Sequence, residues 1–502
     1  MKVLFATAEF APLARVGGLA AATAGYVAEL RKPPWTQRGI EVEVVMPDYS
    51  GITLVDEQRR TLQTSRWVGQ TVARTGLAPD ATGSATIPVT LIDLPGMRRS
   101  HPYLQPNGEG WPDNDHRFMA FSTAVAALTM LDRPDVLHLN DWHTAASLAA
   151  IQNPPPTVLT IHTLGYQGQT DPGWVRSFPY HHTDYLFGGA FNPLAGGVRL
   201  ADLVISVSPH YAAEITTDAG GFGLAGLLRD KGERLAGILN GIDTDEWNPA
   251  TDPNLSVRFD RSDPSPKTLL REQLLAEFGL AGLSGPVMAV VTRLAHQKGV
   301  DLILPVIPYL AGLGARMVVL GSGEQRLVDA VQEAVHRHPE VIGFVNGYDE
   351  GLAHRMFAGS DVFVMPSRFE PCGLAQMQAM RYGSLPLVTD VGGLHDTVID
   401  IDVFPTTGTG VVVPEVSSIA LLDGIHRMAR AFAQTRKRTA MRKRGMGIDW
   451  SWEQPARRHV EWYQRLIDER GRGTRTWVPD GGAGSAMSST VRADDENLTD
   501  RY

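Results

Sequence analysis

The chain has 502 residues, of which 43% are hydrophobic and 20% are charged, a composition that excludes a largely disordered protein and predicts two large globular domains. The formal net charge of −9 argues against a nucleic-acid partner, because such binders depend on a positive surface. The single cysteine excludes an intrachain disulfide, and no apolar run forms a signal peptide or a membrane span, so we expect a cytoplasmic protein without a membrane partner.

The first half of the chain predicts the strands of a parallel sheet. A buried strand over 3–8 leads into a Gly17-Gly18 turn and a helix over 19–30. Four more short apolar runs, each bounded by polar residues or turn formers, predict strands at 42–46, 136–140, 158–162 and 203–207. Continuous apolar runs of this length are typical of parallel strands that are covered on both faces.

The second half repeats this pattern after a proline-rich connection at 248–267. Beyond the connection the sequence predicts helices at 300–313 and 325–338, and strands at 287–292, 317–321, 341–346, 361–366 and 385–390. The fold class is therefore α/β, with two doubly wound, Rossmann-like parallel-sheet domains. Ligands of such sheets bind beyond the carboxyl ends of the strands, so we expect the site in a central cleft between the domains.

Two cations follow the first predicted strand of the second half. Arg293 and Lys298 stand directly ahead of a predicted helix. Beside the N–H groups of a helix start, they would form a site for a diphosphate and could hold the charge of a departing nucleotide. They could equally be solvated residues of a loop, because Arg and Lys are mostly exposed.

Glu370 and Cys372 lie in the loop after the strand predicted at 361–366. Glu370 could accept hydrogen bonds from sugar hydroxyls and stabilise positive charge at an anomeric carbon, or it could be an ordinary acid in the first turn of a helix. Cys372 has no evident base partner. We therefore expect it to be a buried apolar residue and not a nucleophile.

Gly-Gly-Leu follows a predicted strand in both halves, at 17–19 and at 392–394. Each copy could let backbone N–H groups approach a ligand closely, or could simply allow a tight turn between strand and helix.

In the first half, Asp141 and His162 each follow a strand, with Tyr166 close behind. Carboxylate, imidazole and aromatic groups suit a sugar, although His162 alone is better explained as a hydrogen-bonded core residue. Asp-x-Asp occurs three times in unrelated places and is too unspecific to indicate a metal site, and no phosphate-loop motif is present. We expect no metal and no cofactor.

Together these segments resemble the glycogen and starch synthase family over nearly the whole chain. The resemblance rests on Arg15-Val-Gly-Gly-Leu19, Asn140-Asp-Trp-His143, Thr160-Ile-His162 with Tyr166, Asn240-Gly-Ile-Asp243, Arg293 to Gly299, Glu370-Pro-Cys-Gly-Leu374, Gly392-Gly-Leu394 and Ser451-Trp-Glu453. It implies a GT-B fold with domains at 1–245 and 246–451 and a helix at 452–470 that crosses back to the first domain. Composition predicts a disordered tail at 471–502.

The resemblance also implies an activity and a set of site residues. The activity is transfer of glucose from ADP-glucose, or less often UDP-glucose, to the nonreducing end of an α-1,4-glucan with retention of configuration. Arg293 and Lys298 would hold the diphosphate, and Glu370 and His162 would hold the reacting glucose. The remaining substrate-binding residues that the resemblance implies are Arg15, Gly18, Asp141, Tyr166, Asn240, Cys372, Gly373, Leu374, Gly392, Gly393 and Leu394.

Four positions depart from the family pattern. Arg15 and Ala195 stand where the family usually has Lys, Ala21 where it has Asp, and Thr163 where it has Asn. These departures leave two alternatives open, a short-oligosaccharide or small non-glucan acceptor and a weakly active glucan-binding regulatory paralogue. The preferred nucleobase and the oligomeric state also stay open.

Overall fold

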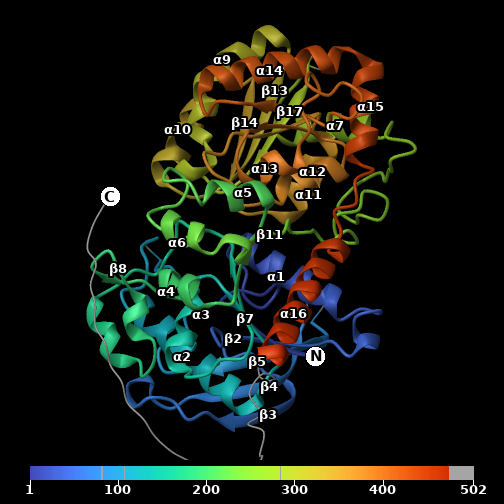
Figure 1. Cartoon of the computed structure of the whole chain (residues 1–502). Coiled ribbons are helices and arrows are strands. Elements are labelled where there is room, and N and C mark those ends of the chain that lie inside the picture. The colour runs from blue at the N-terminus through green and yellow to red at the C-terminus, as the bar shows by residue number, and fades with distance from the viewer. Residues whose placement is uncertain (81–82, 107, 283, 474–502) are drawn as a thin grey trace, which may run out of the picture.

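The computed structural model describes residues 1–502 except 81–82, 107, 283 and 474–502. Two lobes, each built around a sheet flanked by helices, lie one above the other, and the last helix, α16 (Glu453–Gly473), runs down from the junction along the first lobe (Figure 1). Each lobe has its own buried apolar clusters.

The first lobe contains a nine-stranded sheet in the order β11-β10-β7-β6-β1-β2-β5-β4-β3. Neighbours from β11 to β5 are parallel, whereas β4 pairs antiparallel with both β5 and β3. The strands are β1 (Lys2–Ala6), β2 (Glu41–Pro47), β3 (Val55–Thr61), β4 (Val72–Pro79), β5 (Ala85–Asp93), β6 (Val136–Asn140), β7 (Thr157–Ile161), β10 (Leu203–Ser206) and β11 (Leu235–Gly237), with a separate hairpin of β8 (Leu186–Phe187) and β9 (Ala190–Phe191).

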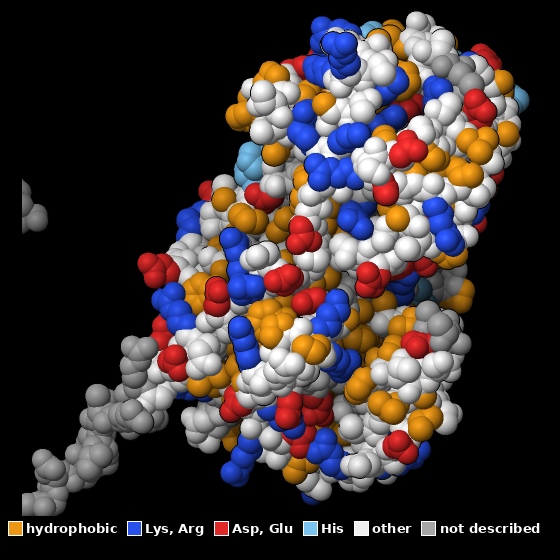
Figure 2. All heavy atoms as spheres, turned by 90° about the vertical axis from the view of Figure 1, so that its right-hand side faces the viewer, with side chains coloured by type: hydrophobic (Ala, Val, Ile, Leu, Met, Phe, Trp, Pro, Cys, Tyr) orange, Lys and Arg blue, Asp and Glu red, His pale blue; other side chains and the backbone are white. Residues whose placement is uncertain are grey.

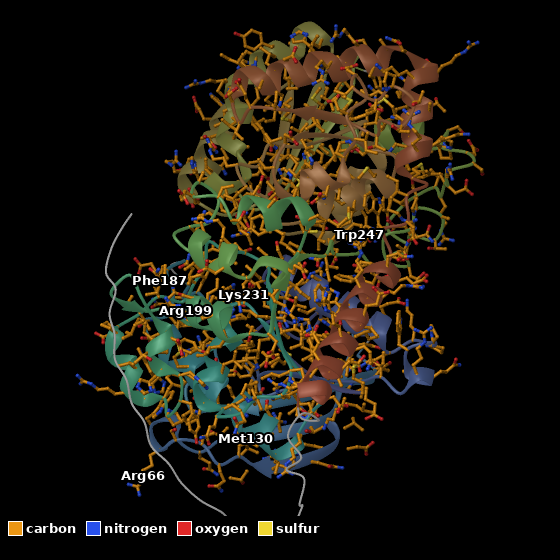
Figure 3. All side chains as sticks on the ribbon, viewed as in Figure 1. Arg66, Met130, Phe187, Arg199, Lys231 and Trp247 are labelled. Atoms are coloured by element: carbon orange, nitrogen blue, oxygen red, sulfur yellow. The ribbon has the colours of Figure 1, made fainter. Side chains whose placement is uncertain are left out.

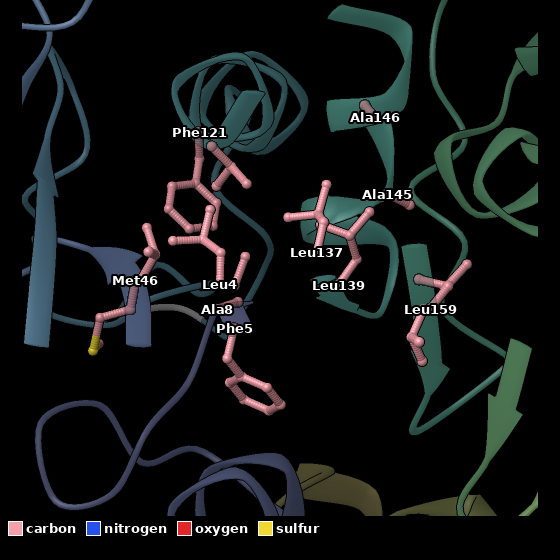
Figure 4. Close-up of a cluster of buried hydrophobic side chains, with 14 of the residues drawn as sticks. Leu4, Phe5, Ala8, Met46, Phe121, Leu137, Leu139, Ala145, Ala146 and Leu159 are labelled. Atoms are coloured by element: carbon pink, nitrogen blue, oxygen red, sulfur yellow. The ribbon is translucent and has the colours of Figure 1, made fainter. Parts of the chain in front are cut away.

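The core of this lobe forms because the central strands are apolar on both faces. β1, β6 and β7 bury nearly every residue, and Phe121 from α2 joins Leu4, Leu137 and Leu159 from these strands in one cluster (Figure 4). Apolar burial of this kind stabilises by about 25 cal/mol per Å². The helices of the lobe are α1 (Gly18–Leu30), α2 (Asn114–Asp132), α3 (Trp142–Ala145), α4 (Pro193–Leu200), α5 (Pro209–Glu214) and α6 (Ala225–Asp230).

The second lobe contains a six-stranded, all-parallel sheet in the order β14-β13-β12-β15-β16-β17. Its strands are β12 (Val287–Val291), β13 (Arg316–Gly321), β14 (Ile342–Asn346), β15 (Val362–Met365), β16 (Leu385–Thr389) and β17 (Val411–Val413). Its helices are α7 (Lys267–Glu277), α8 (Val300–Ile303), α9 (Ile307–Leu310), α10 (Gln325–Arg337), α11 (Glu350–Gly359), α12 (Ala375–Arg381), α13 (Gly392–Thr397), α14 (Ser418–Ala433) and α15 (Thr435–Gly445).

The connection at 248–266 has no helix or strand but packs firmly on the second lobe. Leu255 and Phe259 join a core cluster of that lobe, and the buried Asp252 accepts a hydrogen bond from the Tyr382 hydroxyl. Trp247, at the junction of the lobes in Figure 3, stacks on His354 with ring centroids 4.0 Å apart.

Helix α16 packs on the first lobe. Tyr463 lies in the core of that lobe, where its hydroxyl is 2.6 Å from the Tyr26 hydroxyl and 2.5 Å from His138 Nδ1. The helix ends at Gly473, so the tail predicted at 471–502 begins too early by three residues, and the rest of that prediction lies outside the described residues.

The predicted fold class is confirmed, and the predicted strands agree with the structure to within two residues at each end. The prediction of one regular helix at 300–313 is wrong in detail, because α8 and α9 alternate there with 3-10 turns. Pro305 and Pro308 lack the N–H groups that a continuous α-helix requires. None of the helices in the described ranges has both the length and the apolar character of a membrane span.

Candidate active site

The predicted site residues gather where parallel strands of both sheets end. Asp141 directly follows β6 and His162 directly follows β7, whereas Arg293, Glu370 and Gly392 come after β12, β15 and β16. Because the carboxyl ends of parallel strands meet at one edge of a sheet, each lobe presents one cluster of polar groups.

The second lobe presents a buried ion pair. Lys298 Nζ donates to Glu370 Oε2 at 2.6 Å, and the two side chains are 15% and 7% exposed. Ser367 Oγ donates to the same carboxylate oxygen at 3.1 Å. Glu370 Oε1 accepts no hydrogen bond from the described residues, which leaves it available to a ligand hydroxyl.

Arg293 is the unpaired cation of this loop. Its side chain is exposed, and its guanidinium forms no hydrogen bond or ion pair with any residue in the described ranges. The loop itself is fixed against the Glu370 loop, since Gln297 Nε2 donates to Phe369 O at 3.2 Å and Arg368 N donates to Gln297 O at 2.8 Å. A free guanidinium and a paired ammonium suit a ligand with two anionic groups.

Gly392 and Gly393 allow the next loop to touch the Glu370 loop. Gly393 N donates to Glu370 O at 2.9 Å. A Cβ on Gly392 would lie 2.0 Å from that carbonyl oxygen, and a Cβ on Gly393 would lie 2.1 Å from Cys372 O. Gly392 also has φ of 42°, a backbone conformation that favours glycine. The second Gly-Gly-Leu segment is therefore a close backbone approach, with Leu394 buried beneath it.

The first lobe presents an electrically neutral imidazole. His162 Nε2 lies 2.9 Å from Asn140 Oδ1, and the Asn140 amide is oriented by donating from Nδ2 to Ala6 O at 3.0 Å. Nε2 therefore carries the proton of the neutral ring, and Nδ1 has no hydrogen-bond partner in the described part of the chain. Burial lowers the pKa of His162 to about 3, so the ring stays neutral at physiological pH.

Asp141 holds the backbone that carries His162. Its Oδ1 accepts from His162 N at 2.7 Å and from Thr163 N at 3.4 Å. Burial raises the pKa of Asp141 to about 7 against the lowering effect of these two bonds. Its φ of 54° is unusual for a residue with a Cβ and costs about 1–3 kcal/mol, a strain typical of functional sites.

Glu9 was missed by sequence reasoning. It is only 4% exposed, and its Oε2 accepts from Val16 N at 2.9 Å and Gly17 N at 3.0 Å, while Tyr103 donates its hydroxyl to Oε1 at 2.9 Å. These bonds hold the loop that ends in Gly18, the first residue of α1. The only sequence signal for Glu9 was its place directly after an apolar run. An acid in that place indicates the end of a strand and does not by itself predict a functional residue.

Several contacts join the two clusters across the cleft. Ser208 Oγ donates to Pro371 O at 2.7 Å, and Gly392 N donates to Glu214 Oε1 at 2.9 Å. The Asn240 backbone lies beside the Cys372 thiol, and Gly18 lies close to Leu374. Sequence reasoning also missed Ser208 and Glu214. The structure thus brings Gly18 and Asn240 to the Glu370–Leu374 loop.

Two predicted site residues lie at the edge of the cluster. Arg15 Nη1 lies 2.8 Å from Glu350 Oε1 and donates to Oε2 at 3.1 Å across the cleft, so its charge is already paired. Tyr166 is 61% exposed.

Cys372 is buried, and burial raises the pKa of its thiol to about 12, as expected for an inert residue.

The structure shows the surroundings of two residues that depart from the family pattern. Thr163 Oγ1 donates to His162 O at 2.8 Å and so turns back onto its own backbone. Ala195 lies in α4 and is fully buried, so its methyl group belongs to the core and not to the cleft.

One described trio could in principle hold a metal. Ligand atoms of Glu246, Glu350 and His354 lie within 4.8 Å of one another. Arg15 already pairs with Glu350, and burial together with the neighbouring Glu350 raises the pKa of Glu246 to about 7, so the trio offers little negative charge to a metal.

Comparison with known proteins shows the family of the chain. Residues 2–230 match the family described as starch synthase catalytic domain, and residues 279–446 match glycosyl transferases group 1. Glycogen synthases of Granulibacter bethesdensis and Halorhodospira halophila are 37% and 38% identical, each over 94% of this chain and 100% of the relative.

Solved structures agree as well. The catalytic domain of starch synthase IV from Arabidopsis thaliana, bound to ADP and acarbose, is 30% identical with a TM-score of 0.81, over 93% of this chain and 99% of that one. Sucrose-phosphate synthase from Thermosynechococcus elongatus, 18% identical with a TM-score of 0.60 over 93% and 99%, shares the GT-B fold. The chain therefore belongs to the glycogen and starch synthase family of glycosyltransferases.

Proposed function

We propose that the protein is a retaining glucosyltransferase that elongates an α-1,4-glucan from ADP-glucose, with UDP-glucose as the less common donor. Full-length similarity to glycogen synthases favours a glucan over a small acceptor and over a regulatory role. The starch synthase structure with ADP and acarbose supports a nucleotide donor and a glucan acceptor. A cytoplasmic location is part of the proposal.

In the proposed reaction, the bond between the anomeric carbon and the diphosphate oxygen breaks while an acceptor hydroxyl bonds to that carbon on the same face. Lys298 and Arg293 stabilise the charge that grows on the leaving diphosphate, which accepts the proton of the hydroxyl. Glu370 Oε1 and His162 Nδ1, both without partners in the described protein, hold hydroxyls of the glucose. The cations of the protein take this role without a metal.

The observation that carries the proposal is the Lys298–Glu370 ion pair, with the exposed Arg293 in the same loop as Lys298. A donor diphosphate would pair with both cations, and a sugar attached to it would reach the carboxylate of Glu370. The thiol of Cys372 is buried and stays protonated, because burial raises its pKa to about 12. It is therefore a poor nucleophile, which supports attack on the same face as departure.

A matrix of donors and acceptors tests the proposal. ADP-glucose and UDP-glucose are each assayed against glycogen, maltooligosaccharides and small alcohols, in buffer with and without EDTA. We expect transfer to glycogen and maltooligosaccharides, the faster rate with ADP-glucose, and no effect of EDTA. Transfer only to small alcohols, or to none of the acceptors, would contradict it.

A further inference from the structure

An ion pair joins the loop of the cleft cations to the loop of Glu370. Arg368 is two residues before Glu370, and Asp301 is three residues after Lys298, in the first turn of α8. Arg368 Nη1 donates to Asp301 Oδ1 at 2.8 Å, and Nη2 donates to Asp301 Oδ2 at 2.7 Å. Both terminal nitrogens of the planar guanidinium are thus bonded, a geometry that fixes orientation as well as distance.

Arg368 also holds the backbone of the cation loop. Its Nη1 donates to His296 O at 2.8 Å, and its backbone N–H donates to Gln297 O. Gly299 lies so close to the other loop that a Cβ there would be 1.9 Å from Pro366 O. The two loops therefore touch at several points, and a shift of one displaces the other.

The Arg368 guanidinium is not a third cation for a ligand diphosphate. Asp301 neutralises its charge, and hydrogen bonds from Arg368 lower the pKa of the Asp301 carboxyl, so the pair is ionised at neutral pH. In contrast, Arg293 has no partner among the described residues, and Lys298 pairs with the carboxylate of the cleft. Arg368 is therefore placed to act on a ligand through the position of these groups.

Ion pairs as such are common on this protein. On the side drawn in Figure 2, positive and negative side chains are interspersed, and most exposed pairs contribute little to stability. Arg355 and Glu277 form one such pair, bidentate at 3.0 and 2.7 Å, with side chains 36% and 38% exposed. That pair joins α11 to α7, whereas the Arg368–Asp301 pair joins two loops that would hold opposite ends of one ligand.

A donor that carries both a diphosphate and a sugar must contact both loops at once. The loops follow the neighbouring parallel strands β12 and β15, with the cations on one and Glu370 on the other. A displacement of about 1 Å between such groups can cost about a hundredfold in rate. We propose that Arg368 and Asp301 are positioning residues, which hold the leaving-group cations at the distance from Glu370 that bond breaking requires. The inference rests on the proposed function for the identity of the donor.

Two single variants, Arg368→Ala and Asp301→Ala, and their combination test the pair in the full-length protein. Because each substitution breaks the same pair, the double variant should be no slower than the slower single variant. Arg368→Lys keeps the positive charge but cannot form two parallel hydrogen bonds. The matched control is Arg355→Ala with Glu277→Ala, which removes a bidentate pair of similar exposure from the same lobe.

Glucose transfer from ADP-glucose and binding of ADP by calorimetry are both measured. We expect kcat to fall about thirtyfold in the two alanine variants and about tenfold in Arg368→Lys, because the reacting groups are misplaced and not removed. The dissociation constant of ADP should stay within about threefold of the wild type with unchanged stoichiometry, because ADP would contact the cation loop. The control should match the wild type in both measurements.

Three results would overturn the inference. One is wild-type kcat in Arg368→Ala or Arg368→Lys, and another is a double variant whose loss equals the product of the two single losses. The third is a loss of ADP stoichiometry with unchanged kcat per bound site, which would show a purely structural role. Thermal unfolding accompanies each variant, and Arg368→Lys carries the test if an alanine variant does not fold.

Failure of the inference is distinct from failure of the proposed function. Normal transfer to glycogen in the wild type and in the Arg368 and Asp301 variants would reject the positioning role and keep the function. A wild type that binds ADP-glucose more tightly than ADP, loses this difference on Arg368→Ala and transfers glucose to no acceptor would keep the positioning role and reject the function.

Discussion

The two lobes line the cleft with side chains of different charge. We call His162 and Asp141 with their loops the first wall, and Arg293, Lys298 and Glu370 with their loops the second wall. On the first lobe, burial keeps His162 neutral by lowering its pKa to about 3, and raises the pKa of Asp141 to about 7. On the second lobe, Lys298 and Glu370 form an ion pair, and Arg293 has no described partner. One wall is thus suited to an uncharged sugar and the other to an anion.

This division follows from how each wall is held. The groups of the first wall are fixed by hydrogen bonds to backbone and amide groups, which need no charge. The cations of the second wall neutralise carboxylates or face solvent until an anionic ligand replaces those partners. A reaction that breaks a bond between a neutral sugar and a diphosphate needs both kinds of surface on opposite sides of that bond.

The largest effect is expected for the cations of the second wall. Lys298→Ala and Arg293→Ala should each lower kcat by about a thousandfold, because a donor aimed at developing charge contributes about 4 kcal/mol. Lys298→Ala should also destabilise the protein, since it leaves Glu370 buried without its cation, whereas Arg293→Ala should leave the melting temperature unchanged.

The measurements are single-turnover glucose transfer and thermal unfolding. Lys437→Ala is a suitable control, because Lys437 is also ion-paired, at 3.3 Å to Asp402, but lies on α15. Turnover within threefold of the wild type in both cleft variants would show that charge on the leaving group is not stabilised here.

A smaller effect is expected at Glu9, which supports the first wall's glycine loop. Glu9→Ala leaves the N–H groups of Val16 and Gly17 without their acceptor, at a cost of about 1–3 kcal/mol. We expect the KM for donor to rise about tenfold with little change in kcat. Glu9→Gln retains an acceptor oxygen and should recover most of the affinity, and a Gln variant as impaired as Ala would show that the carboxylate acts in another way.

Much of this architecture was predictable from sequence because it depends on local patterns. Continuous apolar runs identified the parallel strands, and Gly392 and Gly393 marked a turn that the structure explains by close contact with Glu370 and Cys372. The antiparallel strands β3 and β4 were not predicted. β3 is mostly exposed and rich in charged residues, so no apolar run marks it.

The partners of the site residues were harder to predict. The ion pair of Lys298 with Glu370 joins residues 72 positions apart, and the contact of Glu214 with Gly392 joins residues 178 positions apart. Such pairs depend on how strands are ordered in the sheets and on how the lobes meet. Periodicity along the chain contains neither kind of information.

Proton uptake on unfolding tests whether His162 and Asp141 of the first wall are uncharged in the folded protein. At pH 5 the folded His162, with a pKa of about 3, is neutral, while in the unfolded chain, where its pKa is about 6.5, it binds a proton. Its contribution to stability is therefore lost as pH falls from about 6.5 toward 3. The contribution of Asp141 to stability depends on pH in the opposite direction. Its pKa is about 7 in the folded protein and about 3.9 in the unfolded chain, so this contribution is lost as pH rises from about 4 to 7.

Calorimetry at pH 5 in buffers of different ionisation enthalpy measures this uptake. His162→Gln should lower the number of protons taken up by about one, and Asp141→Asn should raise it by about one. Each proton corresponds to a slope of about 1.4 kcal/mol per pH unit in the free energy of unfolding. Identical uptake in the wild type and both variants would mean that His162 is protonated and Asp141 is ionised in the folded protein, so that the first wall is charged like the second.

The smallest effect is expected at Cys372, which lies in the charged wall and whose buried thiol we expect to take no part in the chemistry. Burial raises the pKa of its thiol to about 12, so almost no thiolate exists at pH 8. Iodoacetamide should leave the native protein unmodified, and Cys372→Ala should retain activity within twofold. Because this is the only thiol in the chain, mass spectrometry gives an unambiguous result. Rapid alkylation that abolishes transfer and is prevented by donor would place a reactive sulfur beside the anomeric carbon and replace same-face attack with a covalent intermediate.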